Sequence, residues 1–337
     1  MALFKLSNAH PAGRGGGIPL LPMETSFYEP NRVAPEPRAE RSRRGKRVDA
    51  GTPPKDTMAH QPTFVSLTDG EFLKEAEGIV RAAQSEGTSL RILGSLAIFA
   101  HSAHVPDAIS LFHALGRVSA GTPLFTDLDL MGYAKQGRAI SGVLEKMGFK
   151  PDNMVNGFFG DRRLIYYEGG GKFHVDIFLD KLEFSHDVEF GKKPGDGRLE
   201  MDYPTITLSD IVLEKLQIHK IARKDLVDLM ILFFGHDVKP AANGEKEAVD
   251  AGYIAGLMTD DWGFWYEATQ NLAKVRQLMG TFVSEGRVKP DQASRIEARV
   301  GALEASLRSV PKGRHWEKRA KVGTAKPWYR EVEEVVR

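Results

Sequence analysis

The chain has 337 residues, no cysteine, 42% hydrophobic residues and a formal net charge of +1. Without cysteine, disulfide frameworks, thiolate zinc sites, iron–sulfur clusters and cysteine nucleophiles are excluded. The apolar content suffices for a sizeable core, and no apolar run approaches the roughly 20 residues that span a bilayer. Because the start also lacks a secretion signal, we expect a cytoplasmic protein without membrane contact.

The near-neutral total hides a division of charge along the chain. Residues 1–57 and 311–337 each carry a net charge of +4, whereas residues 58–310 carry −7. Eight of the 18 prolines also lie in 1–57, where no apolar periodicity is visible, so we expect a disordered basic segment over 1–60. Both basic ends suit contact with nucleic acid, and 311–337 adds aromatic residues. The N-terminal segment could instead be a targeting leader or a solvated tail. The C-terminal segment could instead be a helix and tail docked on the body, with its charges in water.

Periodic patterns begin at Thr68, which can cap a helix over 70–85 with one apolar face. A short strand is expected over 89–93. At Gly94 the pattern changes directly to a helix, and a second helix is expected over 107–118.

The middle of the chain carries strand patterns. Alternation with period two predicts a strand within 122–133, and a helix over 136–147 follows. Three further strands are expected at 155–160, 163–168 and 172–179, the last two joined by a Gly-Gly-Gly turn.

The second half is predicted to be helical after a loop-rich stretch. Its first helix is expected to start with Ser209 as N-cap, and separate helices continue to about residue 308. We therefore predict an α+β fold, with a mixed sheet flanked by helices at 68–205, a helical domain at 206–310 and a basic aromatic segment at 311–337.

Two carboxylates share one side of the first long strand. Asp127 and Asp129 stand at i and i+2, so their side chains point the same way, while Leu128 and Leu130 face the core. Asp176 interrupts an otherwise apolar strand, where a carboxylate is costly unless it is paired, hydrogen-bonded or metal-bound. Converging carboxylates repel one another, and Mg²⁺ or Mn²⁺, which prefer oxygen ligands, relieves that repulsion. We predict that these three aspartates bind metal.

The pair Gly94-Ser95 lies where the strand changes to a helix. Glycine permits close backbone approach, and Ser95 offers a hydroxyl and an N–H at a helix N-terminus, which favours phosphate. With the three carboxylates, these residues predict a nucleoside-triphosphate site in which two metal ions organise an in-line displacement at phosphorus.

The order Gly-Ser, Asp-x-Asp and a third Asp on a later strand resembles the nucleotidyltransferase superfamily with a DNA-polymerase-β-like fold, over roughly 88–236. The chain looks most similar to the AbiEii/AbiGii-type toxin nucleotidyltransferases. Their helical signature is matched by Glu214-Lys215-Leu216, Arg223-Lys224-Asp225 and Asp228.

This resemblance implies a function and roles for single residues. Asp127 and Asp129 would bind metal, and Asp176 would be the third carboxylate and candidate general base. Lys215 would contact a phosphate, and Asp225 would position Lys215 or the substrate. The reaction would move a nucleoside monophosphate from a nucleoside triphosphate to an unidentified acceptor, with release of pyrophosphate.

Alternatives to this function remain open in the sequence. The acceptor could be tRNA or protein, as for a toxin–antitoxin component, or a small molecule; a non-catalytic nucleotide-binding module of the same fold is a further alternative. The charges around Lys215 and Asp225 also fit an ordinary solvated salt-bridge face.

Three other signals are weaker. His101 and His104 have a spacing that permits zinc ligation, but no carboxylate or cysteine completes a site at useful spacing. The aromatic-rich stretch 260–266 suits either base stacking or core packing, and core packing is favoured. His174 shares a strand face with Asp176, and a structural role is favoured over substrate contact.

Overall fold

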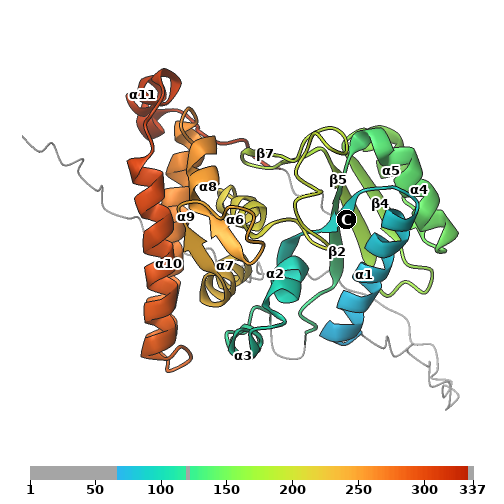
Figure 1. Cartoon of the computed structure of the whole chain (residues 1–337), viewed down its shortest axis with the longest axis horizontal. Helices are drawn as coiled ribbons and strands as arrows, with labels where there is room; N and C mark the ends of the chain where they lie inside the picture. The colour runs from blue at the N-terminus through green and yellow to red at the C-terminus, as the bar shows by residue number, and fades with distance from the viewer. Residues whose placement is uncertain (1–66, 119–121, 333–337) are drawn as a thin grey trace, which may run out of the picture. The chain divides into compact units, whose positions relative to one another are not determined.

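The computed structural model describes residues 67–118 and 122–332 (Figure 1). The expected disordered segment 1–60 lies outside the described residues. Mixed α/β structure with a small mixed sheet is present, as expected for the α+β class. Among the residues that the structure describes, no helix combines the length and apolarity needed to cross a lipid bilayer.

The first helix, α1 (Asp69–Ser85), forms as predicted because its N-terminus is capped on both sides. The Thr68 hydroxyl accepts the Glu71 N–H, and the Glu71 carboxylate accepts the Thr68 N–H. Its buried face has the expected helical spacing and consists of Phe72, Ala76, Ile79, Val80 and Ala83.

A five-stranded mixed sheet has the order β1-β2-β5-β4-β3. β1 (Leu90–Ile92) runs antiparallel to β2 (Asp127–Gly132), and β2 runs parallel to β5 (His174–Leu179). β4 (Arg163–Tyr167) and the two-residue β3 (Lys150–Pro151) complete the sheet by antiparallel pairing. The parallel pair β2–β5 therefore brings two strands that are distant in sequence side by side.

Four helical segments connect the first strands. α2 (Gly94–Ser102) follows β1 directly, α3 (Pro106–Ala114) follows α2, and the 3-10 turn η1 (Ala134–Gln136) leads into α4 (Gly137–Lys146). The predicted end of the second of these helices at residue 118 is wrong, because α3 stops four residues earlier.

The early end of α3 has a local cause. Gly116 adopts a φ of +58°, which breaks the helical conformation. The Arg223 guanidinium donates to the carbonyls of Leu115 and Gly116, so these groups are satisfied without further helical turns.

The predicted strand at 155–160 is wrong, since these residues belong to the helix α5 (Asn153–Phe159). The Asp152 carboxylate caps this helix by accepting the N–H groups of Met154 and Val155. The Asn156 side chain exchanges two hydrogen bonds with the backbone of Ile165 on β4. Side-chain bonds to the backbone thus favour a helix where a short stretch with apolar residues suggested a strand.

The second half begins with α6 (Leu208–Leu216), whose N-cap is Thr207 rather than the predicted Ser209. The Thr207 hydroxyl accepts the Asp210 N–H, whereas the Ser209 hydroxyl accepts the N–H of Asp250. Ser209 therefore joins the helix to a later strand instead of starting it.

The remaining helices are α7 (Arg223–Gly235), α8 (Ala251–Leu257), α9 (Trp262–Ser284), α10 (Pro290–Ser309), α11 (Arg314–Ala320) and the 3-10 turn η2 (Gly323–Ala325). The prediction of an all-helical second half is wrong, because β8 (Asp237–Lys239) and β9 (Ala248–Asp250) form a parallel pair between α7 and α8. A short hairpin, β6 (Lys181–Glu183) with β7 (Asp187–Glu189), also occupies part of the expected loop. Strands of three residues are too short to show a period.

The aromatic stretch at the start of α9 packs inward and against the C-terminal segment. Phe264 is buried, and the Trp262 ring stacks on Tyr266 with centroids 4.9 Å apart. Trp328 contacts both Trp262 and Tyr266 edge-on, and its indole N–H donates to the Glu267 carboxylate. These rings stabilise the docking of residues 311–332 on α9.

Candidate functional site

The parallel pairing of β2 and β5 sets the candidate site. Asp129 is the register partner of Asp176, and Asp127 is the register partner of His174. Register partners on neighbouring strands project to the same face of a sheet, so the three predicted carboxylates share one face. Asp127 is 53% exposed, and its Oδ1 lies 3.3 Å from His174 Nδ1. His174 therefore contacts a predicted metal ligand.

The Gly94-Ser95 turn lies against Asp129, as the motif requires. Gly94 has a φ of +72°, and a Cβ atom there would lie 3.2 Å from Asp129 Oδ2. The neighbouring Leu93 N–H donates to the Asp129 carbonyl at 3.1 Å. Ser95, half-buried, occupies the first turn of α2. Glycine is needed here both for its backbone conformation and for the space it leaves.

A fourth carboxylate, Glu214 of α6, was not predicted as a site residue. Its Oε2 accepts the Gly94 N–H at 2.9 Å, and the side chain is buried. Burial raises the pKa of Glu214, although Lys215 and the Gly94 N–H oppose that rise. The sequence signal for Glu214 was its acidic side chain within the apolar run of α6. Its partner, the Gly94 N–H, lies far upstream in the chain, so the contact could not be predicted locally.

Lys215 is buried among carboxylates, so the alternative of a solvated salt-bridge face is wrong. Its ammonium is 2.9 Å from Asp225 Oδ1, 3.2 Å from Asp228 Oδ2 and 3.6 Å from Glu214 Oε1. Burial opposes the charged form of Lys215, but the three carboxylates outweigh it and raise its pKa well above the ordinary value. Asp225 thus contacts Lys215, which is the positioning that the resemblance implies.

Arg117 extends this network toward β2. Its Nε donates to Asp228 Oδ1 at 2.8 Å, and its Nη1 donates to the Leu124 carbonyl at 2.8 Å. Leu124 stands three residues before Asp127. The buried Asp228 of α7 is therefore connected to the segment that leads into β2.

Asp176 forms a two-pronged ion pair with Arg163 of β4. Arg163 Nε donates to Asp176 Oδ1 at 2.8 Å, and Nη2 donates to Oδ2. This contact raises the pKa of Arg163. Sequence reasoning missed Arg163, because an arginine at the start of a strand is an ordinary edge residue. The side chain of Arg163 is 35% exposed, so the pair borders solvent.

Asp129 lies among several other carboxylates of the site. Burial, followed by the charges of Asp176 and Glu214, raises the pKa of Asp129 to about 7, while Lys215 opposes this rise. The carboxylate is therefore poised between protonated and ionised forms at neutral pH. A cation bound here would remove the repulsion that holds the proton, and the oxygen-only donors fit Mg²⁺ or Mn²⁺.

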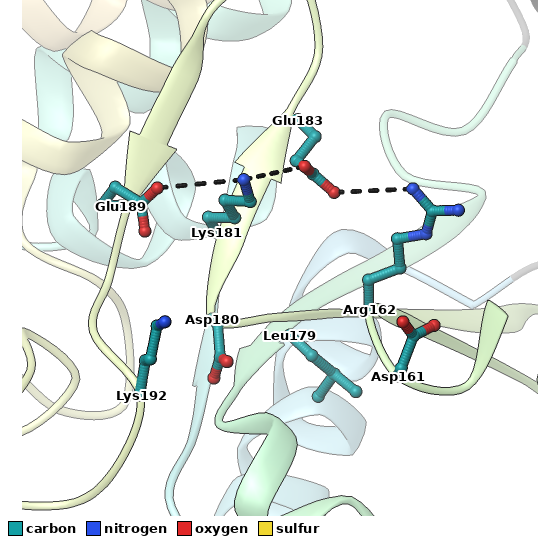
Figure 2. A pocket seen from close by; sticks show the side chains of 8 residues that line it. All are labelled: Asp161, Arg162, Leu179, Asp180, Lys181, Glu183, Glu189 and Lys192. Carbon is teal, nitrogen blue, oxygen red and sulfur yellow. Dashed lines mark ion pairs between the residues drawn. The ribbon is translucent and has the colours of Figure 1, made fainter.

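A pocket of about 480 Å³ lies elsewhere, beyond the end of β5 (Figure 2). Lys181, on its wall, is 2.8 Å from Glu183 Oε1 and 4.0 Å from Glu189 Oε1, and Arg162 is 3.9 Å from Glu183 Oε2. These charges compensate one another, and the predicted site residues are not among its lining residues.

Comparisons with models of protein families, with curated proteins and with solved structures give no match for this chain. The function is therefore inferred from the geometry and chemistry of the residues alone.

Asp129→Asn should make apo protein more stable at alkaline pH. The raised pKa means that the protonated carboxyl stabilises the fold fully below pH 3.8 and that this stability is lost as pH rises through about 7. The variant should therefore exceed wild type by about 1–4 kcal/mol at pH 8 and match it near pH 4. Urea unfolding in EDTA measures this difference. The exposed loop variant Asp196→Asn serves as control, and an Asp129→Asn difference that does not change with pH would contradict the prediction.

Lys215→Met should destabilise the fold by about 3–5 kcal/mol, because it leaves buried carboxylates without their cation. The matched control is Lys224→Met, which removes an exposed lysine next to Asp225 and should change stability by less than about 0.5 kcal/mol. Both free energies come from urea unfolding at pH 7.5. Equal stability of the two variants would show that the buried charges are not coupled as described.

Proposed function

We propose that this protein is a metal-dependent nucleotidyltransferase that moves a nucleoside monophosphate from a nucleoside triphosphate to an acceptor, releasing pyrophosphate. The observation that carries the proposal is the in-register pairing of Asp129 with Asp176 beside the Gly94 turn. The resemblance of the motif order to the nucleotidyltransferase superfamily with a DNA-polymerase-β-like fold supports the same function.

Each part of the site has a task in this reaction. Asp127 and Asp129 would hold Mg²⁺ or Mn²⁺, which when bound supplies charge neutralisation for the triphosphate. The Ser95 hydroxyl and N–H at the start of α2 would bind phosphate oxygens, since helix N-termini favour anions. The site thereby holds the triphosphate with its reacting phosphorus facing the carboxylates.

The geometry favours a different task for Lys215 from the one that the resemblance implies. Three carboxylate groups surround its ammonium, and its side chain is only 7% exposed. A lysine so enclosed acts through its neighbours: it opposes the protonation of Asp129 and neutralises Glu214. Lys215 is therefore a positioning residue in the arrangement described, with Asp225 holding it in place.

Asp176 would complete the second metal site and help to deprotonate the acceptor hydroxyl. Both tasks compete with Arg163, which already donates to both Asp176 oxygens. This ion pair favours one second candidate function, a nucleotide-binding module with a single cation and no transfer. In the catalytic proposal the half-exposed guanidinium must release Asp176 when substrate and metal bind.

Label transfer tests the proposal. The full chain is incubated with each α-³²P-labelled nucleoside triphosphate and Mg²⁺ or Mn²⁺, alone and with total tRNA, mixed proteins or hydroxylated and aminated small molecules as acceptors. Asp127→Ala and Asp129→Ala should each lower transfer at least about 100-fold, because they remove metal ligands. Asp196→Ala, which removes an exposed carboxylate outside the site, should leave transfer unchanged.

The outcome separates the candidates. Transfer to tRNA or protein identifies a toxin-type acceptor, and transfer to small molecules identifies an antibiotic-type enzyme. Metal-dependent binding of a triphosphate without transfer to any acceptor would instead support the binding module. Equal transfer by wild type and Asp129→Ala would refute the catalytic roles of the aspartates.

A further inference from the structure

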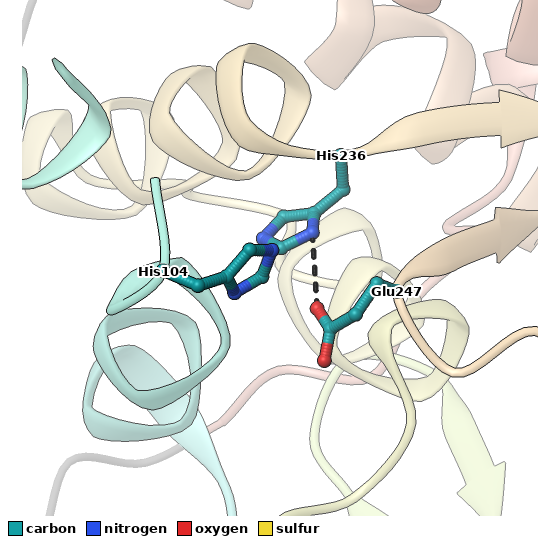
Figure 3. A group of neighbouring side chains, drawn as sticks. All are labelled: His104, His236 and Glu247. Carbon is teal, nitrogen blue, oxygen red and sulfur yellow. Dashed lines mark ion pairs between the residues drawn. The ribbon is translucent and has the colours of Figure 1, made fainter. Parts of the chain in front are cut away.

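A second cluster of metal-binding side chains lies away from the aspartates. It combines His104, which follows α2, His236, which ends α7, and Glu247, which precedes β9 (Figure 3). One ligand atom from each of these residues lies within 4.8 Å of the others. The expectation that no carboxylate completes a zinc site near His101 and His104 is therefore wrong, because Glu247 comes from a distant part of the chain.

One pair in the cluster has the spacing of two ligands on one ion. His236 Nδ1 is 3.2 Å from Glu247 Oε2, and within the described part of the chain this buried nitrogen has no other polar partner. Zinc bonds of about 2.0 Å in a tetrahedron place neighbouring ligand atoms about 3.3 Å apart. A nitrogen–oxygen pair at this separation is therefore spaced so that one zinc ion could bind both atoms.

Surrounding polar groups orient these ligands. His101 Nδ1 lies 3.2 and 3.3 Å from the two Glu247 oxygens, and its Nε2 lies 2.8 Å from the Thr205 hydroxyl. The Ser102 hydroxyl is 3.5 Å from His236 Nε2, the ring nitrogen opposite the one that faces Glu247. Hydrogen bonds from outer residues that fix the ligand side chains are typical of built metal sites.

We propose that His104, His236 and Glu247 bind Zn²⁺. Two imidazoles and one carboxylate suit a borderline ion better than Mg²⁺ or Ca²⁺, which prefer oxygen ligands alone. His104 and Glu247 are exposed, so water fills the fourth position.

The ion would join three segments of the fold. α2 begins at Gly94 and α7 carries Asp225 in its first turn, so both helices run from the candidate nucleotide site to this cluster. Zinc would hold the far ends of the two helices together with the segment before β9. Its expected effect is therefore stabilisation of the folded chain, independent of nucleotidyl transfer.

Zinc titration of the full chain tests the proposal. Protein stripped with EDTA is exchanged into buffer with excess Mg²⁺, which saturates the oxygen ligands, and Zn²⁺ binding is measured by competition with a chromophoric chelator. His104→Ala and Glu247→Gln should each weaken the binding of one zinc equivalent at least tenfold. His113→Ala is the matched control, because this exposed histidine on α3 lies near Asp69 and outside the cluster.

Thermal unfolding gives a second readout. Zinc should raise the unfolding temperature of wild type and His113→Ala, and this rise should disappear in His104→Ala and Glu247→Gln. Circular dichroism verifies that the variants fold, which is expected since both altered side chains are exposed. Zinc binding that is equal in wild type and in the double variant His104→Ala/Glu247→Gln, or no zinc binding by wild type, overturns the proposal.

Discussion

A buried line of alternating charges joins the sheet to the helices that follow it. Glu214 accepts the N–H of Gly94, the adjacent Lys215 is held by two aspartates of α7, and one of these binds Arg117. An unpaired buried charge costs several kcal/mol, so each member depends on the others. Because Gly94 also touches Asp129, this line of charges fixes the turn against β2.

The same network leaves negative charge uncompensated at one place. Arg163 neutralises Asp176, and Lys215 is divided among three carboxylates. Burial and the negative charges of Asp176 and Glu214 raise the pKa of Asp129 to about 7. A protein that kept this carboxylate only for structure would be more stable with an amide there. A cation at the proposed site would relieve the repulsion between these carboxylates.

How much of this site the sequence predicts depends on the range of the interaction. The common face of Asp127 and Asp129 follows from strand period alone, and the Gly94 turn follows from the change of pattern beside it. The adjacency of Asp129 and Asp176 requires a parallel register between distant strands, which local patterns do not determine and only the family resemblance implied. Sequence reasoning did not identify Glu214 and Arg163 as site residues, because their partners, Gly94 and Asp176, are not their neighbours in the sequence.

The errors in secondary structure have a similar origin. Residues 155–160 are rich in apolar side chains, but side-chain bonds from Asp152 and Asn156 to the backbone decide for a helix. β8 and β9 are three residues each and exist through their mutual pairing, so neither could be recognised alone. Where a contact is local and periodic the sequence predicts it, and where a short element depends on a distant partner it does not.

The two clusters of ligands are chemically separate but mechanically related. Oxygen-only donors near Asp129 select hard cations, whereas the imidazoles of His104 and His236 with Glu247 favour zinc, so the two ions need not compete. α2 has nine residues and a length of about 13 Å, with Gly94 at one end and the histidine cluster just past the other. A helix this short moves as one rigid body, so its two ends move together. Zinc bound at its far end, as proposed, would therefore also restrict how far the Gly94 turn can move relative to Asp129 at the proposed phosphate site.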